Sequence, residues 1–394
     1  MDVIGKIAFW AGILCELIVS VSGYAFGGYH EPMIIILGML FFSLSICTHL
    51  ELKKNWLLYL ICAVVGLGYY YMQSSALILR ILLILLAGRE RKADPVIKFF
   101  FWGTLVIMIY TAVLAVLGLH NTVSLTRHFR HEEETRYCFG FYHPNGFAFF
   151  LFRTLVLGLY TYGKRLKLWM MALVAAISMI LFWMAASKMG MAAAFCVIVA
   201  FWLVRYFKTD CAKRNFYILG NVLMALEILF ITVSMVCFVP SAEYDLTGEG
   251  LWQIFNELTT GRLFFIHKAF INYTVPLWGY KGFMEATEVG FVNALYNQGI
   301  VFLLAYLTAL FYLFYRMYRK KDLPALVLIL GFTMYAMSEA FLPYFNKNGV
   351  WMLFLGWNLY RMGKGMETHI VREQPEAAAA GDKKAEENEK YEED

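Results

Sequence analysis

Residues 96–119 read VIKFFFWGTLVIMIYTAVLAVLGL, an apolar run of 24 residues with a single charge at Lys98. A helix of about 20 mostly apolar residues is long enough to cross the hydrocarbon core of a bilayer. Similar runs recur along the chain, of whose 394 residues 60% are hydrophobic and only 16% charged. Soluble domains contain about 25% charged residues. The composition therefore excludes a soluble globular protein and predicts a membrane protein with many spans.

About twelve apolar runs are predicted to form transmembrane helices in an all-α bundle. We place them at 7–26, 32–50, 56–71, 74–88, 96–119, 146–162, 168–186, 189–207, 216–240, 289–315, 323–342 and 349–362. The first run continues for a full span, so we expect a retained helix rather than a removed signal peptide.

The distribution of Lys and Arg predicts the orientation, because these residues concentrate in cytoplasmic loops. With a cytoplasmic N-terminus, 15 bases fall in the 32 residues of the inner loops 51–55, 89–94, 163–167, 207–215 and 316–322. The outer loops hold only 8 bases in 90 residues. We therefore expect both termini in the cytoplasm, and the outer bases need another explanation. They are Arg127, Arg130, Arg136, Lys188, Arg262, Lys268, Lys281 and Lys347.

Two parts are expected along the chain. Residues 1–366 form a membrane-embedded domain with two larger external loops, 120–145 and 241–288. Residues 367–394 carry ten acidic and four basic residues and few apolar ones, which is typical of a disordered tail, here cytoplasmic. The seven cysteines have no metal-ligand spacing and are predicted to be small core residues.

The first external loop ends in Arg136-Tyr-Cys-Phe-Gly-Phe-Tyr-His143-Pro144-Asn145, directly before an apolar run. Pro144 favours a helix start, which would hold His143 and Asn145 at the membrane surface. His143 then serves either as a base or sugar ligand, or simply as a polar helix cap. Arg136 lies among aromatic residues, an arrangement that suits a phosphate or the face of a sugar.

Lys188 stands in a very short outer turn. It either snorkels to the interface or supplies a fixed charge for a pyrophosphate. In the second external loop, residues 251–270 would place apolar residues on one face, so this segment is predicted to lie along the membrane plane. Thr259 or Thr260 would cap it, and Gly261 would let Arg262 approach a ligand.

Glu288 precedes the next span and is either a charge partner of a helix N-terminus or a catalytic base. Charges inside the membrane are costly and are functional or paired by default; they are Glu16, Arg80, Arg153, Glu227 and Glu339. Arg80 would pair with Glu16 or Glu227. Glu339 lies near Asn346 and Lys347 in the chain and could join an external site.

The order of these motifs resembles the O-antigen ligase and polysaccharide polymerase superfamily, especially Wzy-type polymerases of surface polysaccharides. The resemblance runs from about 136 to 346 and rests on Arg136, His143-Pro144-Asn145, Ser187-Lys188, Thr260-Gly261-Arg262 and Gly279-Tyr280-Lys281-Gly282. The earlier spans match only in architecture. The sequence departs from the family at Lys188, where Arg is frequent, and at Val289, where Asn is usual. Ligases usually carry His in place of Glu288, so the carboxylate favours a polymerase.

The resemblance implies a GT-C-like, multi-pass glycosyltransferase of the bacterial plasma (inner) membrane that needs no metal or other cofactor. Its donor would be a glycan on undecaprenyl pyrophosphate and its acceptor a lipid-linked oligosaccharide repeat unit. A flippase and a chain-length regulator would be protein partners, in the lipid bilayer, and nucleic acid would not be bound. Arg136 and Arg262 would stabilise charge, while Glu288 or His143 would be the base. The implied substrate contacts are Lys188, Asn145, His267, Lys268, Lys281, Arg80, Glu339 and Asn346.

Two alternatives remain open. One is a ligase of the same superfamily, which moves the glycan from the lipid to another acceptor. The other is a lipid-oligosaccharide flippase or transporter, which would concentrate its polar residues in a central cavity rather than in two external loops. The sequence contains no Walker, Rossmann or zinc-type motif.

Overall fold

The fold is seen in a computed structural model of the chain. It describes residues 2–25, 31–48, 52–89, 91–129, 132–206, 209–240, 248–259, 261–281, 288–337, 339–340, 342, 344–347 and 351–358. The predicted tail 367–394 lies outside these residues, as do Thr260 and Gly282.

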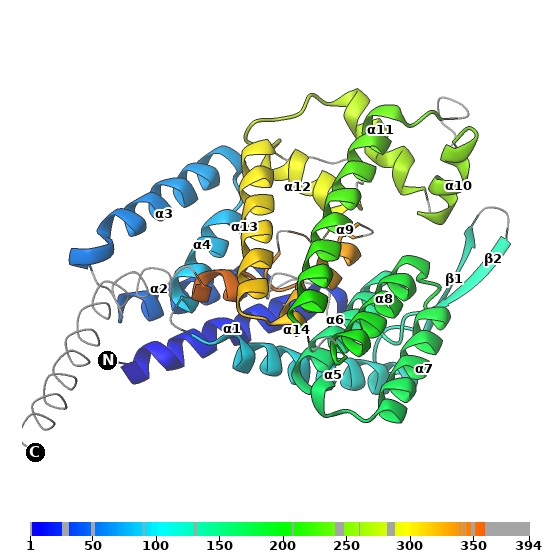
Figure 1. The fold of residues 1–394 in the computed structure, drawn as a ribbon, viewed down its shortest axis with the longest axis horizontal. Helices are drawn as coiled ribbons and strands as arrows, with labels where there is room; N and C mark the ends of the chain where they lie inside the picture. Colours follow the sequence, from blue (N-terminus) through cyan, green and yellow to red (C-terminus); the bar gives the residue numbers. More distant parts are fainter. Residues whose placement is uncertain are drawn as a thin grey trace, which may run out of the picture.

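Helices make up most of the described chain (Figure 1). They are α1 (Asp2–Ala25), α2 (Glu31–Cys47), α3 (Leu52–Gln73), α4 (Leu77–Gly88), α5 (Ala93–Val116), α6 (Pro144–Tyr162), α7 (Leu168–Met184), α8 (Lys188–Val204), α9 (Asp210–Cys237), α10 (Leu251–Leu258), α11 (Arg262–Asn272), α12 (Gly290–Gln298), α13 (Ile300–Arg319) and α14 (Leu323–Tyr335). A 3₁₀ turn, η1 (Gly163–Arg165), follows α6, and residues 351–358 are also helical.

Six helical segments are long and apolar enough to cross a membrane. By helix length and composition, the prediction of a membrane protein is therefore confirmed. They are Val3–Ser22, Asn55–Gln73, Ala93–Val116, Pro144–Arg165, Asp210–Cys237 and Ile300–Arg319. The apolar helices α2, α4, α7, α8 and α14 have only 12 to 17 residues. At 1.5 Å per residue they are shorter than a bilayer core of about 30 Å. The total of about twelve spans stays a prediction.

Two predicted helical segments are interrupted at glycines. The run 289–315 divides at Gly299, whose φ of 91° ends α12 and starts α13. A Cβ at this position would lie 2.4 Å from the carbonyl oxygen of Leu277, so only glycine fits here. The run 251–270 divides in the same way at Gly261, with a φ of 87°, into α10 and α11. The single helix expected in the membrane plane is therefore two helices with a corner.

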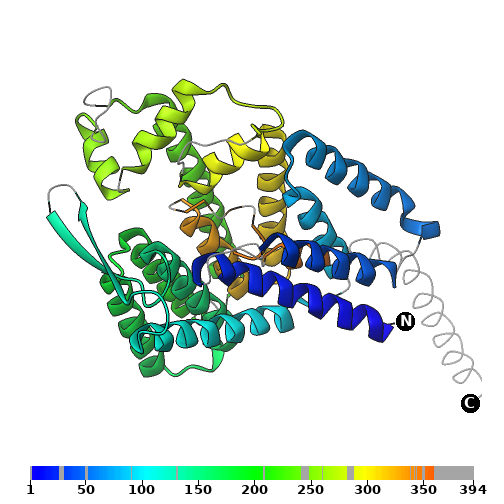
Figure 2. The same ribbon diagram turned by 180° about the vertical axis from the view of Figure 1, so that it is seen from behind.

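The first external loop contains a two-stranded antiparallel sheet, which an all-α prediction omits. It consists of β1 (Ser124–Phe129) and β2 (Glu132–Tyr137), with Leu125 opposite Arg136. The hydroxyls of Thr126 and Thr135 lie 3.1 Å apart across the pair. The hairpin projects from the helices beside α7 (Figures 1 and 2). It sets the position of Arg136 at the end of β2.

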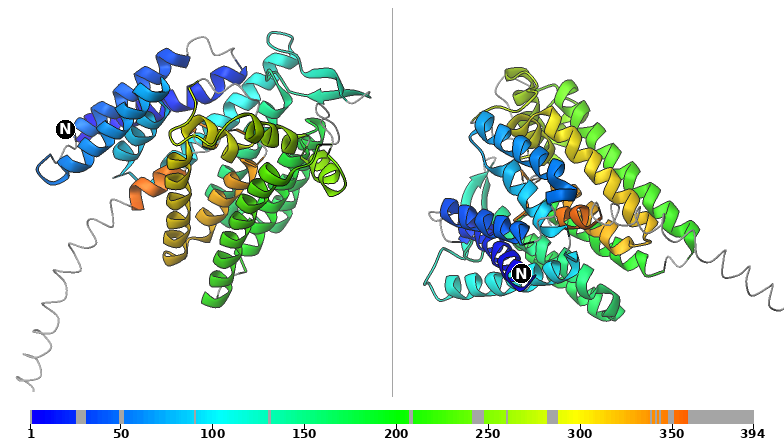
Figure 3. Two further views of the ribbon diagram at one scale, coloured as in Figure 1. Left: turned by 90° about the horizontal axis from the view of Figure 1, so that it is seen from above. Right: turned by 90° about the vertical axis from the view of Figure 1, so that its left-hand side faces the viewer.

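The core is centred on α6, which is buried along most of its length. α14 packs against α6, α8, α9 and α13, and the ring of Phe152 stacks on Tyr335 with centroids 4.4 Å apart. Seen from above, α1 and α2 lie to one side of the group formed by α9, α13 and α14 (Figure 3). At one end of α9 and α13, the short helices α10, α11 and α12 gather (Figure 1), and α11 packs on α9.

Candidate functional site

Arg262 is the centre of the candidate site. It is the first residue of α11 and is buried. Its Nη2 atom lies 2.9 Å from Oε2 of Glu288 and 3.6 Å from Oε1 of Glu339. Its Nη1 atom donates a hydrogen bond of 3.0 Å to the carbonyl of Thr259. One guanidinium thus joins two carboxyl groups that come from separate segments of the chain.

The corner between α10 and α11 fixes the direction of Arg262. Asn256, at the buried side of α10, accepts a hydrogen bond from the amide of Gly261 on its carbonyl (2.7 Å) and one from Phe264 on its side chain (3.3 Å). Thr259 does not cap α11 as expected, because its hydroxyl bonds back to the carbonyls of Phe255 and Asn256. The N-cap is Gly261, since the left-handed backbone there excludes most other residues.

Glu288 and Glu339 are brought together by a close backbone contact. The predicted span 323–342 ends early, because α14 stops at Tyr335, and Glu339 lies four residues beyond it. The amide of Gly290, at the start of α12, donates a 2.7 Å bond to the carbonyl of Ala336. A Cβ at Gly290 would lie 2.8 Å from that carbonyl oxygen, so glycine permits the contact. Glu288 itself is 54% exposed, whereas Glu339 is buried.

Burial raises the pKa of the Glu339 carboxyl to about 8. Glu288 raises it further, while the positive charges of Arg262, Lys347 and Arg136 oppose the shift. Desolvation outweighs the attraction of Arg262, whose Nη2 lies 3.6 Å from the carboxyl. At neutral pH the Glu339 carboxyl is therefore mostly protonated and can donate a hydrogen bond.

Arg136 organises a second group of predicted site residues. Its Nε donates to the carbonyl of Ala185 (3.1 Å), and its Nη2 donates to the carbonyl of Ala186 (3.2 Å) and to Oδ1 of Asn145 (3.1 Å). The hairpin, the start of α6 and the α7–α8 turn are thereby joined. The charge of Arg136 also acts on Glu339, as the weakest of the charges that affect the pKa of that carboxyl.

His143 is the N-cap of α6, and its Nδ1 accepts a 3.1 Å hydrogen bond from the amide of Asn145. One of the two alternatives for His143, a helix cap, therefore explains the hydrogen bond that Nδ1 accepts. Glu288 is exposed beside Arg262 and is therefore the first candidate for a catalytic base.

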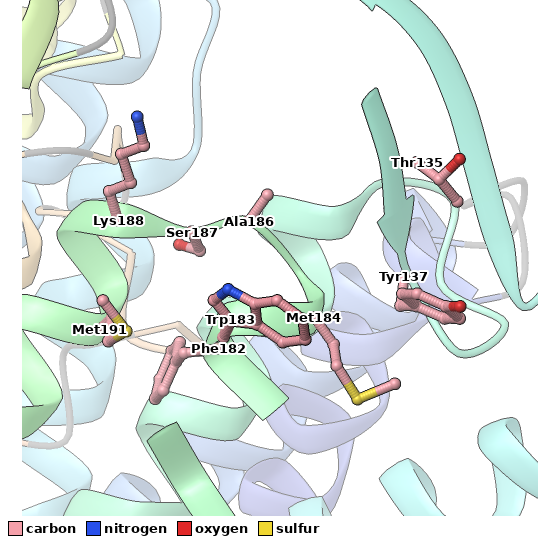
Figure 4. A pocket seen from close by; sticks show the side chains of 9 residues that line it. All are labelled: Thr135, Tyr137, Phe182, Trp183, Met184, Ala186, Ser187, Lys188 and Met191. Atoms are coloured by element: carbon pink, nitrogen blue, oxygen red, sulfur yellow. The ribbon is translucent and has the colours of Figure 1, made fainter. Parts of the chain in front are cut away.

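Lys188 lies at the start of α8 and lines a pocket of about 290 Å³ (Figure 4). The other lining residues are Thr135, Tyr137, Phe182, Trp183, Met184, Ala186, Ser187 and Met191. Arg136, Arg262 and Glu288 are not among them. Of the residues predicted to bind or transfer a substrate, Lys188 is the one that lines this pocket, which lies at the α7–α8 turn that Arg136 contacts.

The remaining predicted residues lie around this centre or behind it. The ring nitrogen Nδ1 of His267 is 2.9 Å from the carbonyl of Met235, which ties α11 to α9. Lys268 is partly buried on α11, and Lys281 is exposed. Arg80 forms a buried ion pair with Glu16, which is one of its two expected partners.

Arg153 is the residue that the sequence analysis left without a role. It is fully buried in α6, and its Nη1 donates a 2.7 Å hydrogen bond to the carbonyl of Asn346, a predicted substrate contact. Its guanidinium lies over the ring of Phe100, 4.6 Å from the centroid. A charge within an apolar run was the available signal, but its partner is 193 residues away in the chain.

In the part of the chain that the structure describes, no three His, Cys, Asp or Glu residues are grouped so that they could hold a metal ion. The chain was also compared with known proteins. No protein-family model, no curated protein and no solved structure matches it.

Proposed function

We propose that this protein is a membrane glycosyltransferase that polymerises undecaprenyl-pyrophosphate-linked oligosaccharide repeat units into a surface polysaccharide. It works on the outer face of the bacterial plasma membrane, with about twelve spans and both termini in the cytoplasm. The observation that carries the proposal is the contact of Arg262 with Glu288 and Glu339, with Arg136 as a further cation whose charge acts on Glu339. An enzyme for lipid pyrophosphate donors needs cations near a carboxylate, and these residues supply both.

The chemistry follows from a good leaving group. The acceptor hydroxyl attacks the anomeric carbon of the donor, and the bond from that carbon to the pyrophosphate oxygen breaks, which inverts the configuration. The pyrophosphate takes the bonding electron pair, and Arg136, Lys188 and Arg262 stabilise the charge that develops. Glu288 accepts the proton of the hydroxyl. It suits this role because its side chain is half exposed and lies beside Arg262, 2.9 Å from Nη2.

The same group of residues would also serve a ligase, and the presence of Glu288 in place of His is the reason to prefer a polymerase. A flippase or transporter would need a polar path through the bundle. The centre of the bundle instead holds Phe149, Phe150 and Phe152, all fully buried on α6, and the neighbouring Arg153 is enclosed against the rings of Phe100 and Phe150. The charges of Arg80 and Glu16 are buried and paired with each other, so they do not provide such a path. These observations favour an enzyme.

The test is complementation of a deletion strain with wild type, Arg262→Ala, Arg136→Ala and the control Arg214→Ala, which changes an exposed arginine of α9. Polymer length is measured by gel electrophoresis and protein amount by immunoblot. We expect single repeat units in place of long chains for the first two variants, and normal chains for the control. Normal chain length with Arg262→Ala present at wild-type level would refute the proposal. Long lipid-linked chains that never reach an acceptor would indicate a ligase.

A further inference from the structure

The pocket at the α7–α8 turn is mainly apolar and aromatic. In Figure 4, Trp183 and Met184, at the end of α7, extend toward Tyr137 on β2, and Met191 and Phe182 lie on the other side of Trp183. Trp183 is 75% exposed, so most of its apolar surface is accessible to a lipid or another ligand. A flexible thioether such as Met184 adapts to irregular apolar ligands.

An exposed apolar stripe of α7 leads to the pocket. Leu173, Ile177 and Ile180 are each about half exposed, and their spacing places them on one face of the helix. The stripe ends at Trp183 and Met184, where the pocket begins. An apolar chain that lies along α7 in the bilayer can therefore extend into the pocket without crossing polar surface.

The polar end of the pocket is small. The Lys188 side chain extends upward from it and forms no ion pair with any described residue (Figure 4). The hydroxyl of Ser187 likewise has no hydrogen-bond partner in the described part of the chain. Gly190 leaves room for that hydroxyl, because a Cβ there would lie 2.7 Å from it. The backbone of Ala186 is left-handed, with a φ of 49°, a strained conformation that places Ser187 at the rim of the pocket.

We infer that this pocket binds the phosphate-bearing end of an isoprenoid lipid, with the first isoprene units among Trp183, Met184 and Tyr137 and the phosphate beside Lys188. The identity of the lipid rests on the proposed function, in which polyprenyl pyrophosphate is the carrier that leaves the donor. The Arg136 group adjoins the same turn through Ala185 and Ala186. The pocket would therefore hold the phosphates of the carrier beside the turn that Arg136 contacts.

A sugar would fit this pocket less well. A sugar ring needs several hydrogen-bond partners, and the Thr135 hydroxyl is already close to that of Thr126. In Figure 4 the hydroxyl of Tyr137 points away from Trp183. Ser187 and Lys188 remain, and they lie together at one end. An apolar chain with one charged end matches that distribution.

The experiment is photo-crosslinking of the full-length protein in phosphatidylcholine nanodiscs. The probe is an isoprenoid phosphate that carries a diazirine in its second isoprene unit, and mass spectrometry locates the attachment. We expect labelling within residues 182–191 and of Tyr137. Undecaprenyl phosphate in excess should suppress labelling, whereas the same amount of phosphatidylglycerol should not. Equal suppression by phosphatidylglycerol would indicate a general anionic-lipid site, and labelling elsewhere would remove the pocket; both outcomes overturn the inference.

A matched pair of double variants provides the control. Trp183→Ala with Lys188→Ala should lower the labelling yield about tenfold, as for loss of an aromatic anchor and its charge. Lys167→Ala with Trp169→Ala removes the same residue types at the opposite end of α7 and should leave the yield within about twofold. Both tryptophans are exposed, so neither loss should impair folding, which size-exclusion chromatography checks. Lys188→Glu alone, which reverses the charge, should also reduce labelling.

The labelling test of the pocket and the polymer-length test of the proposed function can fail independently. If the pocket binds the probe but Arg262→Ala still makes long polymer, the carrier site stands and the polymerase proposal fails. If the double variant labels like the control while Arg262→Ala abolishes polymer, the polymerase stands and the pocket has another use.

Discussion

Arg262 and Arg153 are both buried arginines, and they hold the same stretch of chain from two sides. Arg262 contacts Glu339, and Arg153 donates to the carbonyl of Asn346, seven residues later. Arg262 has two carboxyl partners, of which Glu288 is half exposed. Arg153 is completely enclosed, and the partners it contacts are a carbonyl and aromatic rings.

The difference separates a group that is open to solvent through Glu288, as the proposed function requires, from a group that holds its surroundings in place. A phosphate can exchange for the exposed Glu288 at Arg262, because one charge-assisted bond replaces another. Arg153 offers no such exchange, since no solvent reaches it. The distinction depends on partners and burial, and both residues appear in the sequence simply as arginine near apolar residues.

The largest expected effect is that of Glu288→Gln. If Glu288 is the base, the amide removes proton transfer and lowers the transfer rate by about 10²- to 10⁴-fold. The ion pair to Arg262 is also lost, but a neutral hydrogen bond can replace it. Transfer is measured with purified protein and lipid-linked repeat units. Glu257→Gln, an exposed carboxyl of α10, is the control and should change the rate little. A Glu288→Gln rate within threefold of wild type would remove Glu288 as the base.

Arg262→Lys should have the next largest effect, a loss of about 10²-fold in the transfer rate. A lysine keeps the charge but cannot contact Glu288, Glu339 and the Thr259 carbonyl together, because it lacks the planar fork of arginine. Protein yield and thermal stability should change much less than the rate. Equal losses of rate and stability would place Arg262 with Arg153 among the supporting residues.

Arg153→Met should have the opposite profile. It removes a charged hydrogen bond to the Asn346 carbonyl, which stabilises the fold by about 1.5–3 kcal/mol. Methionine can still pack on Phe100, so we expect a folded but less stable protein. Thermal unfolding in detergent measures the loss, and raising the temperature should inactivate this variant earlier than wild type. A Met variant with wild-type stability but no activity would show that Arg153 acts in the reaction.

The sequence predicted much of the fold because apolar runs and charged loops follow directly from the bilayer. The pair of α3 and α4 agrees with the predicted runs to within a few residues. Long-range partners could not be read in this way: Arg153 meets Asn346 across 193 residues, and Gly299 interrupts a run that looks like one helix. The meeting of Arg262 with Glu288 and Glu339 depends on the close contact at Gly290. No local pattern marks that contact, so the sequence named all three residues without their geometry.

The most gradual expected effect is the pH dependence that Glu339 gives to stability. Its pKa is about 8 in the folded protein and 4.5 as the ordinary value, so between these values the folded state keeps a proton that the unfolded state has lost. The free energy of unfolding therefore falls as pH rises through this window, by at most about 1.4 kcal/mol per pH unit. Below pH 4.5 both states are protonated and the effect disappears. Glu339→Gln stays neutral, so its unfolding temperature relative to wild type should increase from pH 5.5 to pH 7.5. A constant difference between the two proteins across that range would mean that Arg262 keeps Glu339 ionised, and Arg262 would then be a tightly paired residue rather than one open to substrate.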